Sequence, residues 1–200
     1  MSDVAARGSS GRRLRADAER SISAILDAAV DVLAERPDAS IGQIAVAAGV
    51  ARQTVYAHYE SREALLGAVA DRALAQAVAA IDAAEPERGA PAEALERLVG
   101  AWWETVERHA RVLEALAQAF PHTEELHEFH SPILERLERL VRRGHRAGEF
   151  DRRLPVAWVA VAFLALMHAA AEEVASGRMD AGAAGRALER TVPRAFGVRD

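Results

Sequence analysis

The feature that most restricts the fold is the segment Ser40–Leu66, SIGQIAVAAGVARQTVYAHYESREALL, in which two short helix patterns follow one another. Ser40 can cap a helix over Ile41–Ala48, because its hydroxyl accepts from backbone N–H groups that have no partner inside the helix. Gly49 ends that helix, since glycine adopts the left-handed conformation at little cost. A third helix, over about residues 51–57, follows at once. Two short helices joined at a glycine turn match a helix-turn-helix, but taken alone they also match the helical hairpins of proteins that never touch DNA.

Longer helices are expected on both sides of this pair. The segment before it predicts a helix over about Arg20–Glu35, which ends at Pro37 because proline lacks an N–H group. Its buried stripe follows the i, i+3, i+4, i+7 spacing and consists of Ile22, Ile25, Leu26, Ala29 and Leu33. After the pair, Ser61 can cap a helix over about Arg62–Ala83.

The rest of the chain also reads as helix. The clearest break is AAEPERGAP, residues Ala83–Pro91, with two prolines and a glycine. The helical patterns after it cover about Ala92–His109, Arg111–Phe120, Thr123–Ala147, Val156–Ser176 and Ala181–Ala195. No convincing strand pair appears, so we predict an all-α protein. A three-helix N-terminal domain (residues 19–66) is joined by the fourth helix to a larger helical bundle (residues 67–200).

Composition excludes several classes of protein. The chain has no cysteine, which excludes disulfides and thiolate metal sites and fits a reducing cytoplasm. The N-terminal residues have no apolar core of a secretory signal, so we expect a cytoplasmic protein. The most apolar stretch, Pro155–Glu173, is rich in alanine and contains His168, so a bundle or dimer-interface helix is favoured there over a membrane helix.

The short third helix carries side chains suited to DNA, although the formal net charge of the chain is -5. Val50 and Val55 are expected to face inward, which leaves its polar residues to solvent. Arg52 and Gln53 can make paired contacts to base edges. The other predicted contacts are phosphate-type donors, namely Thr54, Tyr56, His58 and, in the first turn of the fourth helix, Arg62.

The first 18 residues are small and polar, with four arginines among glycine and serine. We expect a flexible basic arm, which is either a solvated tail or an arm that reaches DNA phosphates. The four arginines are Arg7, Arg12, Arg13 and Arg15.

Together, these residues resemble the DNA-binding domain of the tetracycline-repressor (TetR) family of transcriptional regulators. The matching positions are Ile44-Ala45, Ala48-Gly49-Val50, Thr54-Val55-Tyr56-Ala57-His58-Tyr59 and Ser61-Arg62-Glu63-Ala64-Leu65-Leu66. With the preceding helix included, the resemblance covers some 45 residues.

The resemblance implies a role for each matched residue. Arg52 and Gln53 would read bases, and Tyr59 would be mainly a core aromatic residue. The residues that would hold the DNA backbone are Ser40, Thr54, Tyr56, His58 and Arg62, and the core residues would be Ile41, Ile44, Val50 and Val55.

This chain departs from the family pattern at three places. Ala51 stands where a Ser or Thr helix cap is usual, so a cap commonly worth about 1 kcal/mol is missing. Arg62 replaces the usual lysine, which keeps the charge but favours forked contacts. The RPDAS turn lacks the usual glycine-aromatic step, so its local conformation is expected to differ.

By the same resemblance, the C-terminal bundle would bind a small-molecule effector and form a homodimer. Helices over Val156–Ser176 and Ala181–Ala195 would pair with their copies, and the protein would be a repressor released from a near-palindromic operator. Candidate pocket residues are Trp102, Trp103, Val106, His109, Phe120, Phe129, His130, Phe163, Met167 and His168, although aromatic residues at helical spacing are also typical of an ordinary core. Because adjacent helix positions differ by about 100°, Trp102 and Trp103 are not expected to face the same cavity.

Other functions have weaker support. The segment His122–His130 contains one Glu-x-x-His pair, Glu124 and His127, whereas a di-iron bundle needs that pair on two helices. The sequence has no nucleophile elbow or phosphate loop, so we expect no enzyme activity, no cofactor and no metal. A helical metal protein or enzyme, and a ligand-independent or activating regulator, remain the alternatives.

Overall fold

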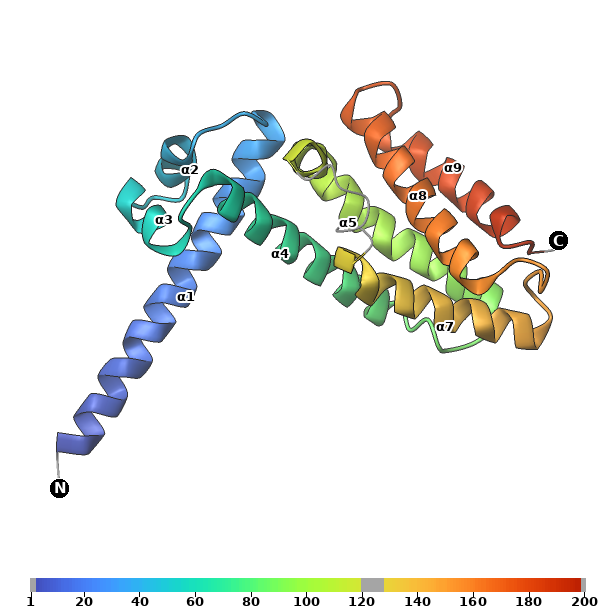
Figure 1. Cartoon of the computed structure of the whole chain (residues 1–200), viewed down its shortest axis with the longest axis horizontal. Coiled ribbons are helices and arrows are strands. Elements are labelled where there is room, and N and C mark those ends of the chain that lie inside the picture. Colours follow the sequence, from blue (N-terminus) through green and yellow to red (C-terminus); the bar gives the residue numbers. More distant parts are fainter. Residues whose placement is uncertain (1–2, 120–127, 199–200) are drawn as a thin grey trace. The chain divides into compact units, whose positions relative to one another are not determined.

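The structure of the chain is a computed structural model that describes residues 3–119 and 128–198, with side chains described for residues 16–107 and 128–198. The described residues are helical and contain no strand (Figure 1). They divide into two compact units, residues 1–69 and residues 70–200. The all-α prediction is therefore confirmed.

The first unit is built from helices α1 (Asp3–Glu35), α2 (Ile41–Ala47) and α3 (Arg52–His58), with the start of α4 (Arg62–Ala83). The boundaries of α2, α3 and α4 agree with the predicted helices to within about a residue. Buried apolar side chains from all four helices form its core, among them Ile25, Leu33, Ile44, Val55 and Leu65. Burial of one stripe on each short helix fixes which residues of α2 and α3 remain outside.

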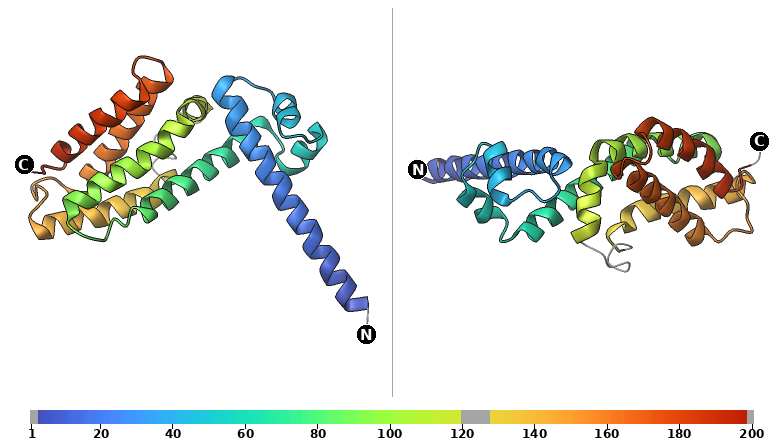
Figure 2. Two further views of the ribbon diagram at one scale, coloured as in Figure 1. Left: turned by 180° about the vertical axis from the view of Figure 1, so that it is seen from behind. Right: turned by 90° about the horizontal axis from the view of Figure 1, so that it is seen from above.

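The N-terminal segment differs from its prediction. We expected a flexible arm over residues 1–18, but α1 begins at Asp3 and continues without interruption to Glu35 (Figure 2). Alanine and arginine favour helix, and they dominate the segment over Gly8 and Gly11, whose cost is about 1 kcal/mol each. The backbone of this segment is therefore helical in the structure.

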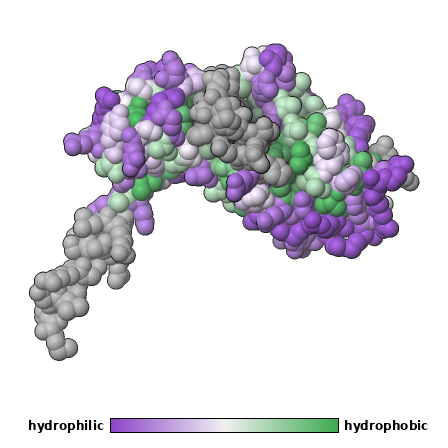
Figure 3. All heavy atoms as spheres, in the orientation of Figure 1, coloured by the Kyte–Doolittle hydropathy of each residue, from purple (hydrophilic) through white to green (hydrophobic). Residues whose placement is uncertain are grey.

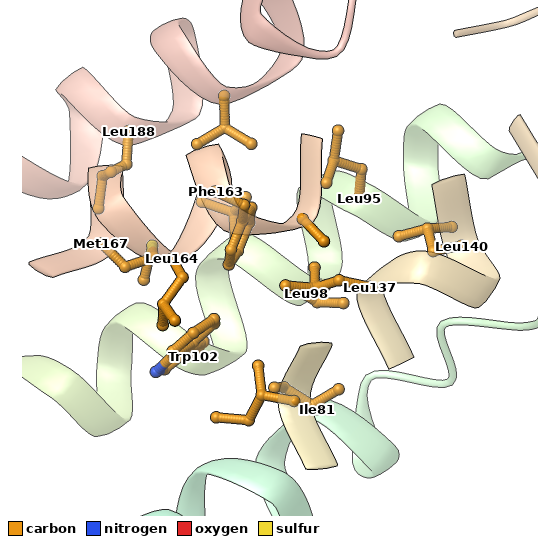
Figure 4. Packing of buried hydrophobic residues seen from close by; sticks show 14 of the residues in the cluster. Ile81, Leu95, Leu98, Trp102, Leu137, Leu140, Phe163, Leu164, Met167 and Leu188 are labelled. Carbon is orange, nitrogen blue, oxygen red and sulfur yellow. The ribbon is translucent and has the colours of Figure 1, made fainter. Parts of the chain in front are cut away.

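The second unit is a helical bundle made of the rest of α4 with α5 (Pro91–Ala119), α7 (Ser131–Ala147), α8 (Val156–Ala175) and α9 (Ala181–Ala195). Helix α8 packs against α5, α7 and α9. Figure 4 shows part of the core that these helices enclose. In this core, Trp102 of α5 stacks on Phe163 of α8, and their ring centroids are 5.1 Å apart.

Two helix boundaries in this unit differ from the predictions. Helix α5 is continuous to Ala119, whereas two helices were predicted there. Helix α7 begins at Ser131 rather than Thr123, and the chain makes a turn at His130. Pro132 lies in the first turn of α7, where its missing N–H group costs nothing, so it starts a new helix instead of continuing an earlier one.

Two glycines allow aromatic rings to approach helix backbones closely. A Cβ atom at Gly144 of α7 would lie 2.1 Å from Cδ2 of Phe150, which is buried and packs edge-on against Phe196. A Cβ atom at Gly185 of α9 would lie 2.9 Å from Nε1 of Trp103, whose indole N–H donates to the carbonyl of Ala181 at 3.2 Å. The absence of a side chain at both positions is therefore part of the packing.

Helix α8 also exposes apolar surface. Trp158 is 62% exposed, and Val161, one turn later, is exposed as well. Hydrophobic residues appear between hydrophilic ones on the visible face of this unit in Figure 3. By length and composition, α4 and α8 could each cross a membrane, a property that core and interface helices of soluble proteins share.

Candidate nucleic-acid interface

The turn between α2 and α3 is fixed by its own backbone. The Gly49 N–H donates to the carbonyl of Val46 at 3.1 Å, and the Val50 N–H donates to the carbonyl of Ala45 at 3.0 Å. This pair of bonds is the Schellman arrangement, which satisfies carbonyls at the end of α2. It requires a left-handed residue, and Gly49 has a φ of 66°. The predicted role of Gly49 is thus confirmed by the backbone.

The start of α2 has a complete capping box. The Ser40 hydroxyl accepts from the Gln43 N–H at 3.4 Å, and the Gln43 side chain accepts from the Ser40 N–H at 2.8 Å. The cap at Ser40 was predicted from the sequence, whereas the part that Gln43 takes in it was not. The Ser-x-x-Gln spacing is a known signal for this reciprocal cap, so the pairing could have been found in the sequence.

The start of α3 has no such support. Ala51 occupies the N-cap position in an extended conformation, and no side chain caps the helix there. The first helical bonds are made by the Ala51 carbonyl, which accepts from Thr54 at 2.8 Å. The predicted lack of a cap is confirmed.

Helix α3 divides cleanly into a buried and an exposed face. Val55 is fully buried, while Arg52, Gln53 and Tyr56 are exposed. The other predicted contact residues of this helix, Thr54 and His58, are half-buried, as are Val50 and Tyr59. Since Val55 holds the helix by one side, the exposed face is available to a partner.

Arg52 and Tyr56 contact each other on that exposed face. The Arg52 Nη2 atom donates to the Tyr56 hydroxyl oxygen at 3.2 Å. The guanidinium carbon also lies 5.4 Å from the centroid of the Tyr56 ring, within the range of a cation–π contact. The hydrogen bond to Tyr56 raises the pKa of Arg52 above its ordinary value. Like any arginine in a protein, Arg52 is a permanent cation.

Arg62 has partners that the sequence did not indicate. Its Nε donates to the carbonyl of Ala39 at 3.2 Å, and its Nη2 donates to the carbonyl of Pro37 at 2.6 Å. Both carbonyls belong to the turn between α1 and α2, so the forked side chain ties the first turn of α4 to that turn. A lysine at this position has no fork with which to make both bonds in the same way.

The candidate pocket residues in the second unit separate into two groups. The first group is buried in the core and consists of Trp102, Trp103, Val106, Phe163 and Met167. The two indoles point to different neighbours, because Trp102 stacks on Phe163 while Trp103 bonds to α9. This agrees with the expectation that they do not share a cavity. The side chain of His109 and all of Phe120 lie outside the described residues.

The second group is a cluster of rings formed by His130, His168 and Phe129. The His130 ring lies 5.0 Å from both the His168 ring and the Phe129 ring, and both pairs are edge-on. His130 is buried and His168 is half-buried. Burial, with a smaller contribution from the charge of His130, lowers the pKa of His168 to about 4. At neutral pH, His168 is therefore uncharged.

The Glu-x-x-His segment that was weighed as a metal site lies largely outside the described residues, and this holds for His122, Glu124 and His127. Elsewhere, among the residues that the structure does describe, no three His, Asp or Glu side chains come together as a metal site would require.

Comparisons with known proteins match the N-terminal helices and, for solved structures, most of the chain. Residues 25–69 match the family model described as bacterial regulatory proteins, tetR family. The HTH-type transcriptional repressor LfrR of Mycolicibacterium smegmatis is 48% identical over 81 residues, which cover 40% of this chain and 43% of that protein. The crystal structure of the TetR-like regulator LfrR in complex with proflavine aligns with 87% of this chain and 94% of its own, at 33% identity and a TM-score of 0.68. The chain belongs to the tetR family.

A less similar solved structure supports the fold alone. The fatty acid degradation regulator FadR from Bacillus halodurans aligns over 90% of this chain and 97% of its own, with a TM-score of 0.76 at 22% identity. Of these two proteins, the tetR-family relative LfrR is described as a transcriptional repressor. The matched region of the family model contains all the predicted DNA-contact residues, from Ser40 to Arg62.

Proposed function

We propose that this tetR-family chain is a homodimeric repressor that inserts α3 into the DNA major groove. The observation that carries the proposal is the exposed face of α3, where Arg52, Gln53 and Tyr56 stand beside a fully buried Val55. Arginine and glutamine make paired hydrogen bonds to guanine and adenine, respectively. A negative formal net charge is compatible with DNA binding, because the contact needs only a local cationic face.

Phosphate contacts would fix α3 in the groove. Thr54, Tyr56 and His58 bring hydroxyl and imidazole donors to the rim of the exposed face. Ser40 would contribute at the start of α2, although its hydroxyl also takes part in the capping box. Arg62 would act mainly by holding the turn before α2 through its two carbonyl contacts, with its remaining N–H groups left for a phosphate.

Dimerisation would use α8 and α9 from two copies. Exposed Trp158 and Val161 lie on α8 beside exposed alanines, which permit close approach of another helix. In a dimer, the two α3 helices would enter successive major grooves about 34–36 Å apart, so the operator should be a near-palindrome.

A small aromatic effector would bind the second unit and cause the protein to release the DNA. The protein would act in the cytoplasm. The proflavine complex of LfrR supports an aromatic ligand, since LfrR is a relative at 33% identity. The predicted pocket residues remain the candidates for contacts to it. A coupling of about 1–3 kcal/mol would change operator affinity 5- to 150-fold.

The DNA-binding step is tested by selection of duplex fragments from the source genome with the purified protein. We expect enrichment of near-palindromic sites, and an affinity that falls steeply as salt rises, because bound arginines displace counterions from phosphates. A salt-independent affinity would contradict phosphate-anchored docking.

The sign of regulation needs a separate measurement. A reporter gene under the selected promoter should be less active in cells that contain the protein, and proflavine is a suitable first probe for its release. Higher reporter activity with the protein present would instead support an activator. Repression that no tested ligand relieves would support a ligand-independent regulator.

A further inference from the structure

Arg52 and Tyr56 form a contact that the separate roles of base reader and phosphate donor do not explain. They lie one helical turn apart on the exposed face of α3. The hydrogen bond from Arg52 Nη2 to the Tyr56 oxygen is 3.2 Å long, and the guanidinium carbon lies 5.4 Å from the ring centroid. Two parts of Tyr56, the hydroxyl and the ring face, therefore contact the same guanidinium.

The hydrogen-bond capacity of the pair leaves both side chains able to bind DNA. The Tyr56 oxygen accepts from Arg52, so its own O–H proton remains free to be donated to a phosphate. Arg52 uses one of its guanidinium N–H groups in this bond and retains the others for a base edge. Hydrogen bonds in such a chain polarise one another, so the bond from Arg52 strengthens donation by the hydroxyl.

The contact also limits the freedom of a long side chain. An exposed arginine loses much rotamer entropy when it is fixed on a base, and a side chain that is already held in place loses less. Forked recognition of guanine needs the guanidinium plane in one orientation. The hydrogen bond and the cation–π contact with Tyr56 together restrict the guanidinium before DNA is present.

We propose that Tyr56 is a positioning residue for Arg52 and thereby determines base preference at the position that Arg52 reads. This inference rests on the proposed function, because it requires α3 in the major groove. It changes the expected effect of Tyr56. A residue that only anchors a phosphate would weaken binding to all DNA sequences equally, whereas a positioning residue also changes which sequences are preferred.

The test compares the wild-type chain with Arg52→Ala, Tyr56→Phe and the double variant. Each is used to select binding sites from a duplex library randomised around a twofold centre, and affinities are then measured for the selected site and its single-base variants. We expect Arg52→Ala to reduce discrimination at one base position per half-site by about 5- to 150-fold, the range for a forked contact. Tyr56→Phe, which keeps the ring and loses the hydroxyl, should reduce discrimination at that same position by a smaller factor.

The double variant separates positioning from an independent role. If Tyr56 acts through Arg52, Tyr56→Phe should cause no further loss of discrimination when Arg52 is already alanine, and only an even loss of affinity should remain. Thr54→Val is the matched comparison, because it removes a phosphate-type hydroxyl from the same helix. It should weaken binding to all sequences by the same factor, without a change of base preference. Circular dichroism checks that each variant remains helical.

Two outcomes would overturn the inference while leaving the proposed function intact. One is a Tyr56→Phe variant that binds every sequence more weakly by the same factor. The other is an Arg52→Ala variant that discriminates as the wild type does. Failure of the wild-type chain to enrich any sequence would overturn the proposed function itself, and the inference with it.

Discussion

The two units of the chain hold their helices by different means. In residues 1–69, the short helices α2 and α3 are held by hydrogen bonds at their ends and in the adjoining turns. These bonds are those of the turn at Gly49, those of the Ser40–Gln43 cap and the two bonds from Arg62. In residues 70–200, the longer helices are held along their lengths by rings, some of which pack against glycine. A helix of two turns has as many end groups as a long one but much less face to bury. Backbone and cap changes should therefore matter most in the first unit, and changes of volume or charge in the second.

The largest effect is expected from pH on the second unit. The pKa of His168 is lowered from 6.5 to about 4, so the unfolded chain takes up a proton at a higher pH than the folded chain does. The free energy of unfolding should therefore decrease as the pH falls from about 6.5 to about 4. Protonation of this group accounts for a decrease of up to about 3 kcal/mol. Urea unfolding across this pH range measures the loss.

A His168→Leu variant is the control, because it replaces the titrating group with an apolar side chain. Its unfolding free energy should fall less over the same interval. Equal pH dependence in the two proteins would show that His168 is not held neutral by its surroundings.

A smaller effect is expected from a single methyl group at Gly144. The new Cβ would lie 2.1 Å from the Phe150 ring, which is itself packed on Phe196. Because that ring is buried and would have to shift, Gly144→Ala should destabilise the protein by about 1–3 kcal/mol. Thermal or urea unfolding measures the change.

The matched control is Gly100→Ala in α5, where a Cβ would have no neighbour within 4 Å. There, the usual preference of helices for alanine should stabilise the protein by up to about 1 kcal/mol. Opposite signs for the two variants would show that ring packing, not helix propensity, determines the need for glycine at position 144.

The smallest effect is expected at the start of α3. Ala51→Ser supplies the missing cap and should stabilise the first unit by about 1 kcal/mol. Ala57→Ser is the control, since it places the same residue at an exposed position inside the helix and should cost a few tenths of a kcal/mol. If neither variant changes the unfolding free energy, the end of α3 does not limit its stability and the contrast between the units is weaker than we infer.

Sequence predicted the first unit more completely than the second because its signals are local. A glycine that must have a positive φ and a serine that caps the next helix act within a few residues, so Gly49 and Ser40 could be assigned directly. The direction of the Arg62 side chain could not be predicted, since its acceptors lie in a turn more than twenty residues earlier. The same holds for the contact of Arg52 with Tyr56, which depends on the choice between rotamers.

In the second unit, helical periodicity predicted which apolar residues are buried but not which residues each one contacts. Trp102, Phe163 and Met167 were named as candidate pocket residues, and their burial in the hydrophobic cluster of this unit fits both a pocket lining and an ordinary core. The helix boundary at Ser131 was missed, although Pro132 was a signal for it. Long helices contact several neighbours, so the partner of each side chain is set by tertiary packing that a periodic pattern does not specify.

The contrasting surroundings of the three tryptophans make the protein its own optical reporter. Trp102 and Trp103 are enclosed by α8 and α9, whereas Trp158 stands in solvent on α8. A dissolved fluorescence quencher such as iodide can reach only an indole that is open to water. Light emitted by Trp158 would therefore record the association of two chains, while emission from the enclosed pair would record the loosening of the bundle, without any attached dye.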